Sequence, residues 1–323
     1  MTVSKEKLNW YGRTFDFEGV RYFNWSASGF EFSFKGTKAV CTFVSDSHKQ
    51  KKTERAWLGI FVNGELENRI ELTQKKADYV IFESEKISSV KIRVMKLSED
   101  AFGMAGFAGM KIDGELEALP QKKKKLKLEF IGDSITCGYG IDGVWEKDVF
   151  STNIERADKS YAYLTSKKLD ADYQMVSWSG IGLISKYVDP SIDLPDDEWT
   201  MLRTWPYTDK SAALRLKIEP EVWDGSRYTP DIVVINLGTN DQSFTRNKPD
   251  RVRTFINLYR ALLENVHRRT PSAKICCCYG VMGQDLAEPI KTAVKLFSRE
   301  FSDVKIKTLI FPVQDEKDGI AAD

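Results

Sequence analysis

Histidine, net charge and long apolar runs are all scarce in this sequence. The 323 residues include only two histidines, His48 and His267, which leaves few candidates for a general base at neutral pH. Forty-eight basic and 47 acidic residues give a net charge of +1, so no global field attracts nucleic acid or an anionic membrane. No run of about 18 apolar residues is present, so we expect no membrane-spanning helix.

Cysteine is also sparse, and its arrangement excludes two kinds of site. There are five cysteines, an odd number, and three of them are consecutive at Cys276 to Cys278. Neighbours on a strand point to opposite faces, so this triplet cannot chelate one metal from one side. We expect plain strand residues and no disulfide framework, which fits a reducing compartment. The first fifteen residues have no apolar core of a secretory signal, so we predict a cytoplasmic protein.

The first 120 residues show the patterns of β-structure. Phe30 to Lys35 alternates apolar and polar residues, as a half-buried strand does. Ala39 to Val44 is predicted as a second short strand. Two further strands, Trp57 to Val62 and Glu65 to Leu72, flank Asn63-Gly64, which is a strong hairpin signal. Many short strands with turn signals favour a β-sandwich or jelly roll.

The pattern changes near residue 122, which predicts two domains, 1–121 and 122–323. Leu119-Pro120-Gln121 is followed by Lys122 to Lys125, which form either a solvated linker or a polyanion site; the near-zero net charge favours the linker. Beyond them strands and helices alternate, as in a doubly wound α/β domain with a parallel, flavodoxin-like sheet. The predicted strands are 127–131, 173–178, 231–237, 274–279 and 304–311, and the predicted helices are 160–169, 251–269 and 285–301.

Polar and glycine residues follow the first three strands of this second domain. Ser134 follows the first, Gly180 the second and Asn240 the third. In open α/β sheets ligands bind beyond the carboxyl ends of the strands. A serine there is a candidate nucleophile, and the N–H groups of Ser134 and Gly180 with the Asn240 amide are candidate oxyanion donors. Each motif also has a plainer interpretation, as a helix cap or a turn.

These motifs carry a family resemblance. Three segments resemble blocks I, II and III of the SGNH (GDSL-type) hydrolases, namely Phe130 to Thr136 (FIGDSIT), Ser179-Gly180 and Gly238 to Asp241 (GTND). Domain order, together with Trp25 to Phe32 and Trp223 to Asp231, resembles carbohydrate esterase family 2. That family joins an N-terminal jelly roll to a C-terminal SGNH domain.

The resemblance implies a serine esterase that removes acetyl groups from sugars. Ser134 is then the nucleophile, and Gly180 and Asn240 complete the oxyanion hole. Asp133 and Tyr187 are implied substrate contacts, although Tyr187 equally fits a packing role. The resemblance implies no metal or organic cofactor, and acetylated oligosaccharides from plant mannan or xylan as substrates. No nucleic acid or membrane partner is expected.

The sequence departs from the family at the general base. The family places a histidine near the C-terminus, shortly after an acidic residue, whereas this chain ends at Asp323. His267 lies in a predicted helix remote from the strand tips, and His48 in a polar segment. We therefore expect the natural protein to continue with a histidine, and Asp323, or secondly Asp318, to orient it.

Two other functions are also compatible with the sequence. Without a base a serine hydroxyl is a poor nucleophile, so the cleft of a non-catalytic glycan-binding protein is one alternative. Another SGNH activity, such as a lipase or thioesterase, is the second. Lipases usually need a large exposed apolar surface, and the sequence shows none.

Overall fold

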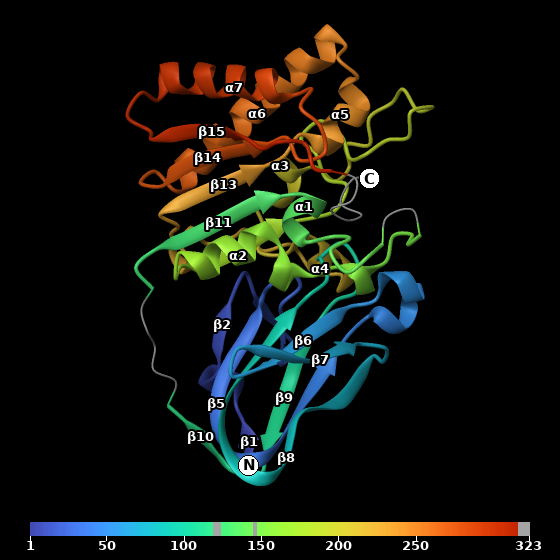
Figure 1. Cartoon of the computed structure of the whole chain (residues 1–323), viewed down its shortest axis with the longest axis vertical. Helices are drawn as coiled ribbons and strands as arrows, with labels where there is room; N and C mark the ends of the chain where they lie inside the picture. The colour runs from blue at the N-terminus through green and yellow to red at the C-terminus, as the bar shows by residue number, and fades with distance from the viewer. Residues whose placement is uncertain (119–123, 145–146, 316–323) are drawn as a thin grey trace.

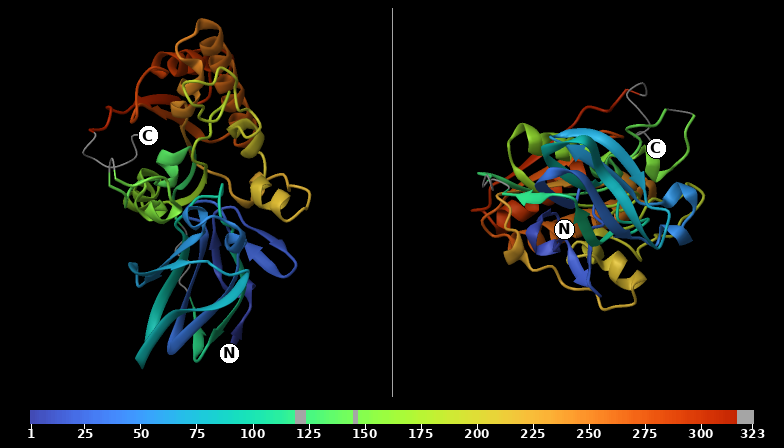
Figure 2. Two further views of the ribbon diagram at one scale, coloured as in Figure 1. Left: turned by 90° about the vertical axis from the view of Figure 1, so that its right-hand side faces the viewer. Right: turned by 90° about the horizontal axis from the view of Figure 1, so that it is seen from below.

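The protein folds into two domains stacked end to end, as Figure 1 and the side view in Figure 2 show. The computed structural model describes residues 1–118, 124–144 and 147–315. We call residues 1–118 the N-terminal domain and residues 124–315 the C-terminal domain. The predicted boundary at residues 121 and 122 lies outside the described residues.

The N-terminal domain is one curled antiparallel sheet of ten strands. Its central path runs in the order β3-β4-β9-β5-β8-β6-β7, and β1, β2 and β10 pair with β9 or β5 at the margins. The strands are β1 (Thr2–Val3), β2 (Asn9–Tyr11), β3 (Phe15–Phe17), β4 (Val20–Tyr22), β5 (Gly29–Val44), β6 (Trp57–Val62), β7 (Glu65–Glu71), β8 (Lys76–Lys96), β9 (Gly106–Ile112) and β10 (Glu115–Glu117). Short 3-10 helices lie at Lys5–Lys7, Ser47–Lys49 and Lys52–Glu54.

The alternation of apolar and polar residues along the strands explains how this sheet forms its core. Phe30, Phe32 and Phe34 of β5 are buried, while the residues between them are partly exposed. The hairpin predicted at Asn63-Gly64 is confirmed by the pairing of β6 with β7. The two strands predicted at 30–35 and 39–44 are in fact one strand, because the pairing with β8 continues past an irregularity at Gly36 to Lys38.

The C-terminal domain is a five-stranded parallel sheet with helices on both faces, as predicted. The strand order is β12-β11-β13-β14-β15. The strands are β11 (Lys127–Gly132), β12 (Asp172–Ser177), β13 (Ile232–Asn236), β14 (Lys274–Tyr279) and β15 (Ile306–Ile310). The α-helices are α1 (Ser134–Cys137), α2 (Tyr161–Lys168), α3 (Met201–Thr204), α4 (Lys210–Arg215), α5 (Thr239–Thr245), α6 (Pro249–Arg269) and α7 (Ala287–Glu300), and 3-10 helices lie at Thr152–Ile154, Ala157–Lys159 and Gly225–Arg227.

The periodicity of the longest helix directs one face to the sheet. The buried residues of α6 recur at spacings of three and four, so they form one stripe. They pack with α7 against one face of β13 and β14, where Cys277 is buried. Cys276 and Cys278 share the opposite face with their Sγ atoms 3.7 Å apart, and all five cysteines are free. None of the helices in the described ranges is long and apolar enough to cross a bilayer.

The N-terminal domain sends buried side chains into the C-terminal domain. Trp25 is fully buried in the core of the parallel sheet, and its indole N–H donates to Thr208 O at 2.8 Å. The Asn24 amide donates to Asp209 Oδ2 at 2.6 Å. Because these contacts are buried, the two domains share one interior across their boundary.

A buried ion pair crosses the same boundary. Arg13 of the N-terminal domain donates from Nη2 to Glu129 Oε1 of β11 at 2.8 Å, and both side chains are almost fully buried. Gln174 and Trp205 also donate to this oxygen. Burial lowers the pKa of Arg13 to about 10, so the guanidinium stays protonated at neutral pH. Arg13 is therefore the cation that neutralises a carboxylate on the strand leading to Ser134.

Removing this cation is expected to destabilise the whole chain. Arg13→Ala leaves Glu129 buried and uncompensated, which should lower the free energy of unfolding by about 3–5 kcal/mol. Lys38→Ala is the control, because it breaks an exposed ion pair with Glu83, and it should cost less than about 1 kcal/mol. Urea unfolding monitored by tryptophan fluorescence measures both. Equal losses in the two variants would contradict the role assigned to Arg13.

Candidate active site

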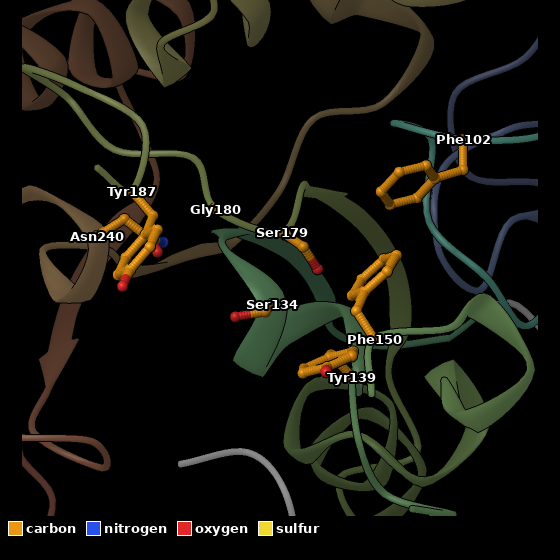
Figure 3. Close-up of a pocket in the computed structure, with 8 residues that line it drawn as sticks. All are labelled: Phe102, Ser134, Tyr139, Phe150, Ser179, Gly180, Tyr187 and Asn240. Carbon is orange, nitrogen blue, oxygen red and sulfur yellow. The ribbon is translucent and has the colours of Figure 1, made fainter. Parts of the chain in front are cut away.

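The three predicted strand-end residues meet at one edge of the parallel sheet. Strands β12, β11 and β13 are neighbours and parallel, so their carboxyl ends lie side by side. A cleft of about 460 Å³ opens there. Figure 3 shows Ser134 between two groups of side chains in this cleft. The lining residues are Phe102, Ser134, Tyr139, Phe150, Ser179, Gly180, Tyr187 and Asn240.

Ser134 stands on a tight turn between β11 and α1. Gly132 ends the strand, and a Cβ there would lie 1.9 Å from Thr136 Oγ1, so only glycine lets α1 return this closely. Asp133 is the N-cap, and its Oδ1 accepts the Ile135 N–H at 3.1 Å. Within the part of the chain that the structure describes, neither Oγ nor N–H of Ser134 has a hydrogen-bond partner. Both groups of Ser134 are therefore available to a ligand.

Gly180 occupies the turn that follows β12. The Ile181 N–H donates to Trp178 O at 3.2 Å and Gly180 has a φ of +77°, as in a type II turn with glycine at its third position. A Cβ on Gly180 would touch nothing, so backbone conformation rather than space requires glycine. Gly180 O accepts the Tyr187 N–H at 2.8 Å, whereas the Gly180 N–H has no acceptor among the described residues.

Asn240 faces the same cleft from α5. Its Nδ2 donates one hydrogen to Ile181 O at 2.9 Å and lies 3.5 Å from Asp133 Oδ2. The second contact is too long for a strong bond, so that hydrogen remains available to an oxyanion. The N-cap of α5 is Gly238, and no side chain caps the helix. The plainer interpretation of Asn240-Asp241 as a helix cap is therefore wrong.

Asp241 holds the loop that contains the glycine turn. Its Oδ1 accepts the N–H groups of Leu183 and Ile184 at 2.8 and 2.7 Å. Burial raises the pKa of Asp241 to about 6. Burial, together with the charges of Asp241 and Glu99, raises the pKa of Asp133 to about 7. Two carboxyl groups with raised pKa values thus lie directly behind the cleft.

Aromatic side chains form the outer walls of the cleft. Tyr187, 58% exposed, stands on the side of Asn240, and its contact with substrate stays a prediction. Phe102, Tyr139 and Phe150 form the opposite wall. The Phe150 ring lies 4.8 Å from Phe102 and 5.2 Å from Tyr139, centroid to centroid. Sequence reasoning missed this wall, because Phe102 comes from the N-terminal domain and no motif surrounds it.

The other predicted site residues fall outside the cleft or outside the described residues. Asp133 is fully buried as the cap of α1, so it supports the serine turn from behind, and a direct substrate contact stays a prediction. His48 is exposed on the N-terminal domain, and His267 packs on Phe297 and Phe301 of the helical face. Neither histidine lines the cleft. Asp318 and Asp323 lie outside the described residues.

Comparison with known proteins identifies both domains. Residues 10–121 match the family described as carbohydrate esterase 2 N-terminal, and residues 130–304 match the GDSL-like lipase/acylhydrolase family. A solved family two carbohydrate esterase from Clostridium thermocellum, in complex with cellohexaose, is 31% identical with a TM-score of 0.80. That comparison covers 97% of this chain and 90% of the other.

Two curated relatives are longer than this chain. Cellulase/esterase CelE of Acetivibrio thermocellus is 32% identical over 93% of this chain and 34% of its own length. An acetylxylan esterase / glucomannan deacetylase of Cellvibrio japonicus is 29% identical over 72% of this chain and 59% of its own length. The chain therefore spans about a third and about three fifths of these two relatives.

The raised pKa of Asp133 predicts a pH dependence of stability. Its pKa rises from 3.8 to about 7 on folding, so the folded state keeps the proton that the unfolded state releases. The free energy of unfolding should then fall as pH rises through this window. Between about pH 5 and about pH 7.5 the fall should be on the order of 2–3 kcal/mol larger in the wild type than in Asp133→Asn.

Urea unfolding at the two pH values measures this difference. Asp133→Asn keeps an oxygen for the Ile135 N–H, so the cap survives the substitution. Glu85→Gln changes an exposed carboxyl and should retain the wild-type pH dependence. Identical pH dependence in the wild type and Asp133→Asn would show that Asp133 is ionised in the folded protein at both pH values.

Proposed function

We infer the function of this chain from its family and its site together, since the chain belongs to carbohydrate esterase family 2. We propose that it is a carboxylic ester hydrolase that removes O-acetyl groups from carbohydrates. The observation that carries the proposal is the meeting of Ser134, the Gly180 N–H and the Asn240 amide in one cleft. A hydroxyl beside several free donors is the arrangement that acyl transfer from an ester needs.

The proposed reaction proceeds through an acetylated serine. Ser134 Oγ attacks the carbonyl carbon of the acetyl ester and loses its proton to a base. The N–H groups of Ser134 and Gly180 and the Asn240 amide then donate to the oxyanion. The tetrahedral intermediate collapses, the C–O bond to the sugar breaks, and the sugar oxygen takes up the proton. Water attacks acetyl-Ser134 in the same way, which releases acetate and restores the hydroxyl.

The walls of the cleft support an acetylated oligosaccharide as substrate. Tyr187 on one side, and Phe102 and Phe150 on the other, offer apolar ring surfaces beside the nucleophile. Such surfaces suit the C–H faces of sugar rings. The activities for which the Cellvibrio relative is named, acetylxylan esterase and glucomannan deacetylase, support substrates derived from xylan or mannan.

A second candidate function is carbohydrate binding without turnover. It is favoured by one observation, that neither His48 nor His267 lies beside Ser134. Deprotonation of a serine needs a base, and its loss leaves only part of the catalysis. Binding of an acetylated oligosaccharide without acylation of Ser134 would favour this function.

The nucleophile can be tested by trapping the acetyl-enzyme. Wild-type protein incubated with p-nitrophenyl acetate should acquire an acetyl group on the peptide that carries Ser134, which peptide mass spectrometry detects. The p-nitrophenolate leaving group is far better than a sugar alkoxide, so acylation should outpace deacylation and the adduct should accumulate. Ser134→Ala should acquire none there and should release p-nitrophenol no faster than the background. Acetylation elsewhere, or equal release by the variant, would refute the assignment.

Removal of one oxyanion donor should reduce turnover rather than binding. Asn240→Ala should lower kcat by roughly 10²–10³. KM should change much less, because this hydrogen bond strengthens in the transition state. Asn68→Ala, at an exposed amide of β7, is the matched control and should behave as wild type. Unchanged kcat in Asn240→Ala would mean that its amide serves only to hold Ile181 O.

A further inference from the structure

The loop between β8 and β9, residues 97–105, carries a carboxylate of the N-terminal domain into the active-site turn. Glu99 is fully buried, and its Oε2 accepts the backbone N–H of Ser179. Ser179 and Gly180 are the two central residues of the type II turn, and the second of them supplies the oxyanion donor. Glu99 thus contacts the backbone one residue before that donor, and it is not among the residues that line the cleft.

The direction of the Gly180 N–H depends on one peptide plane. Type I and type II turns differ by a flip of the peptide between the two central residues. Glycine tolerates both, so Gly180 itself does not fix the orientation. The Tyr187 N–H donates to Gly180 O, which lies in the peptide unit after this plane and restrains it from that side. On the other side, the bond from the Ser179 N–H to Glu99 restrains the residue before the plane.

Glu99 lies beside a second buried carboxyl group, that of Glu155, and a buried lysine, Lys96. Glu155 Oε2 accepts the Glu99 backbone N–H at 2.8 Å, and the two carboxyl groups interact. Burial raises the pKa of both carboxyl groups, that of Glu155 well above its usual range, so the pair holds a proton more readily than exposed carboxyl groups do. Lys96 adds a buried ammonium, which donates to Glu99 O at 2.5 Å.

The loop itself is fixed from the C-terminal domain. Arg215 at the end of α4 donates from Nη2 to Asp100 O at 2.6 Å and from Nη1 to Phe102 O. The same loop therefore places Glu99 behind the oxyanion turn and Phe102 in the wall of the cleft. Because Arg215 holds the loop from the domain that contains Ser134, the position of Glu99 relative to the turn is set by both domains.

We propose that Glu99 is a positioning residue of the esterase site, through which the N-terminal domain holds the Ser179-Gly180 turn with its N–H directed at the oxyanion. The proposal rests on the proposed function, because it assigns a donor to an acyl-transfer intermediate. It also implies that the N-terminal domain takes part in the reaction and does more than accompany the hydrolase domain.

The test compares two isosteric changes within the same buried carboxyl pair. Glu99→Gln keeps the size of the side chain but removes the charge from the acceptor of the Ser179 N–H. Hydrogen bonds to ionised groups are roughly twice as strong as neutral ones, so kcat for p-nitrophenyl acetate should fall about tenfold. KM should change by less than about twofold. Glu155→Gln changes the other carboxyl group of the pair, leaves the bond from the Ser179 N–H to Glu99 in place, and should lose less than about threefold in kcat.

A second readout follows the contact without any turnover. Hydrogen exchange of the Ser179 amide should be about tenfold faster in Glu99→Gln than in the wild type, and close to wild type in Glu155→Gln. Glu99→Asp keeps the carboxyl group but is one methylene too short to reach the Ser179 N–H, so it should accelerate exchange similarly. If Glu99→Gln does not fold, Glu99→Asp takes its place in the comparison. Equal effects of the two glutamine variants on kcat, a loss expressed in KM, or unchanged exchange at Ser179 would each overturn the proposal. A wild-type chain that never acetylates Ser134 would instead overturn the proposed function, while the exchange rates still decide whether Glu99 holds the turn.

Discussion

A single buried charge, the carboxylate of Glu129, makes the two domains depend on each other. It lies on β11, the strand that leads to the nucleophile turn, and it is compensated by Arg13 from the other domain. A buried carboxylate without a partner would be strongly unfavourable. Docking of the N-terminal domain therefore stabilises β11, the strand that leads to Ser134, in its buried position. Trp25 adds apolar burial to the same contact.

The active site follows from this docked arrangement with few further requirements. The parallel order of β12, β11 and β13 brings three strand ends to one edge, and backbone geometry supplies the donors there. Gly132 admits the close return of α1, and Gly180 adopts the positive φ of its turn. Buried Asp133 accepts the Ile135 N–H within the first turn, and buried Asp241 accepts the Leu183 N–H in the loop after the second. These buried carboxyl groups hold the backbone of the turns on the side away from the cleft. The open side of the cleft is lined by aromatic side chains.

The elements predicted well from the sequence are those whose signal is local. The strand over Lys274–Tyr279 and the Asn63-Gly64 hairpin were placed at their observed residues, because periodicity and turn chemistry fix them within a short window. The meeting of Ser134, Gly180 and Asn240 followed from topology alone.

Two features of the site, Glu99 and Phe102, could not be predicted from the sequence, because they depend on contacts between distant segments. Glu99 lies in a polar Ser-Glu-Asp stretch, yet it is fully buried. Phe102 is an isolated aromatic with no motif around it. Their roles arise only when residues 97–105 meet residues 139–180 across the domain boundary, and no window of sequence contains both partners.

The interior shared by the two domains also determines which part of this protein can be moved into another protein and still fold. A cut placed at the lysine-rich segment would separate the domains where their sequence patterns change, but it would also divide Arg13 from Glu129 and Glu99 from Ser179. A chimera that joins the hydrolase half to a foreign β-sandwich would inherit the nucleophile without the arginine and the carboxylate that accompany it here. In this fold the transferable module is the pair of domains.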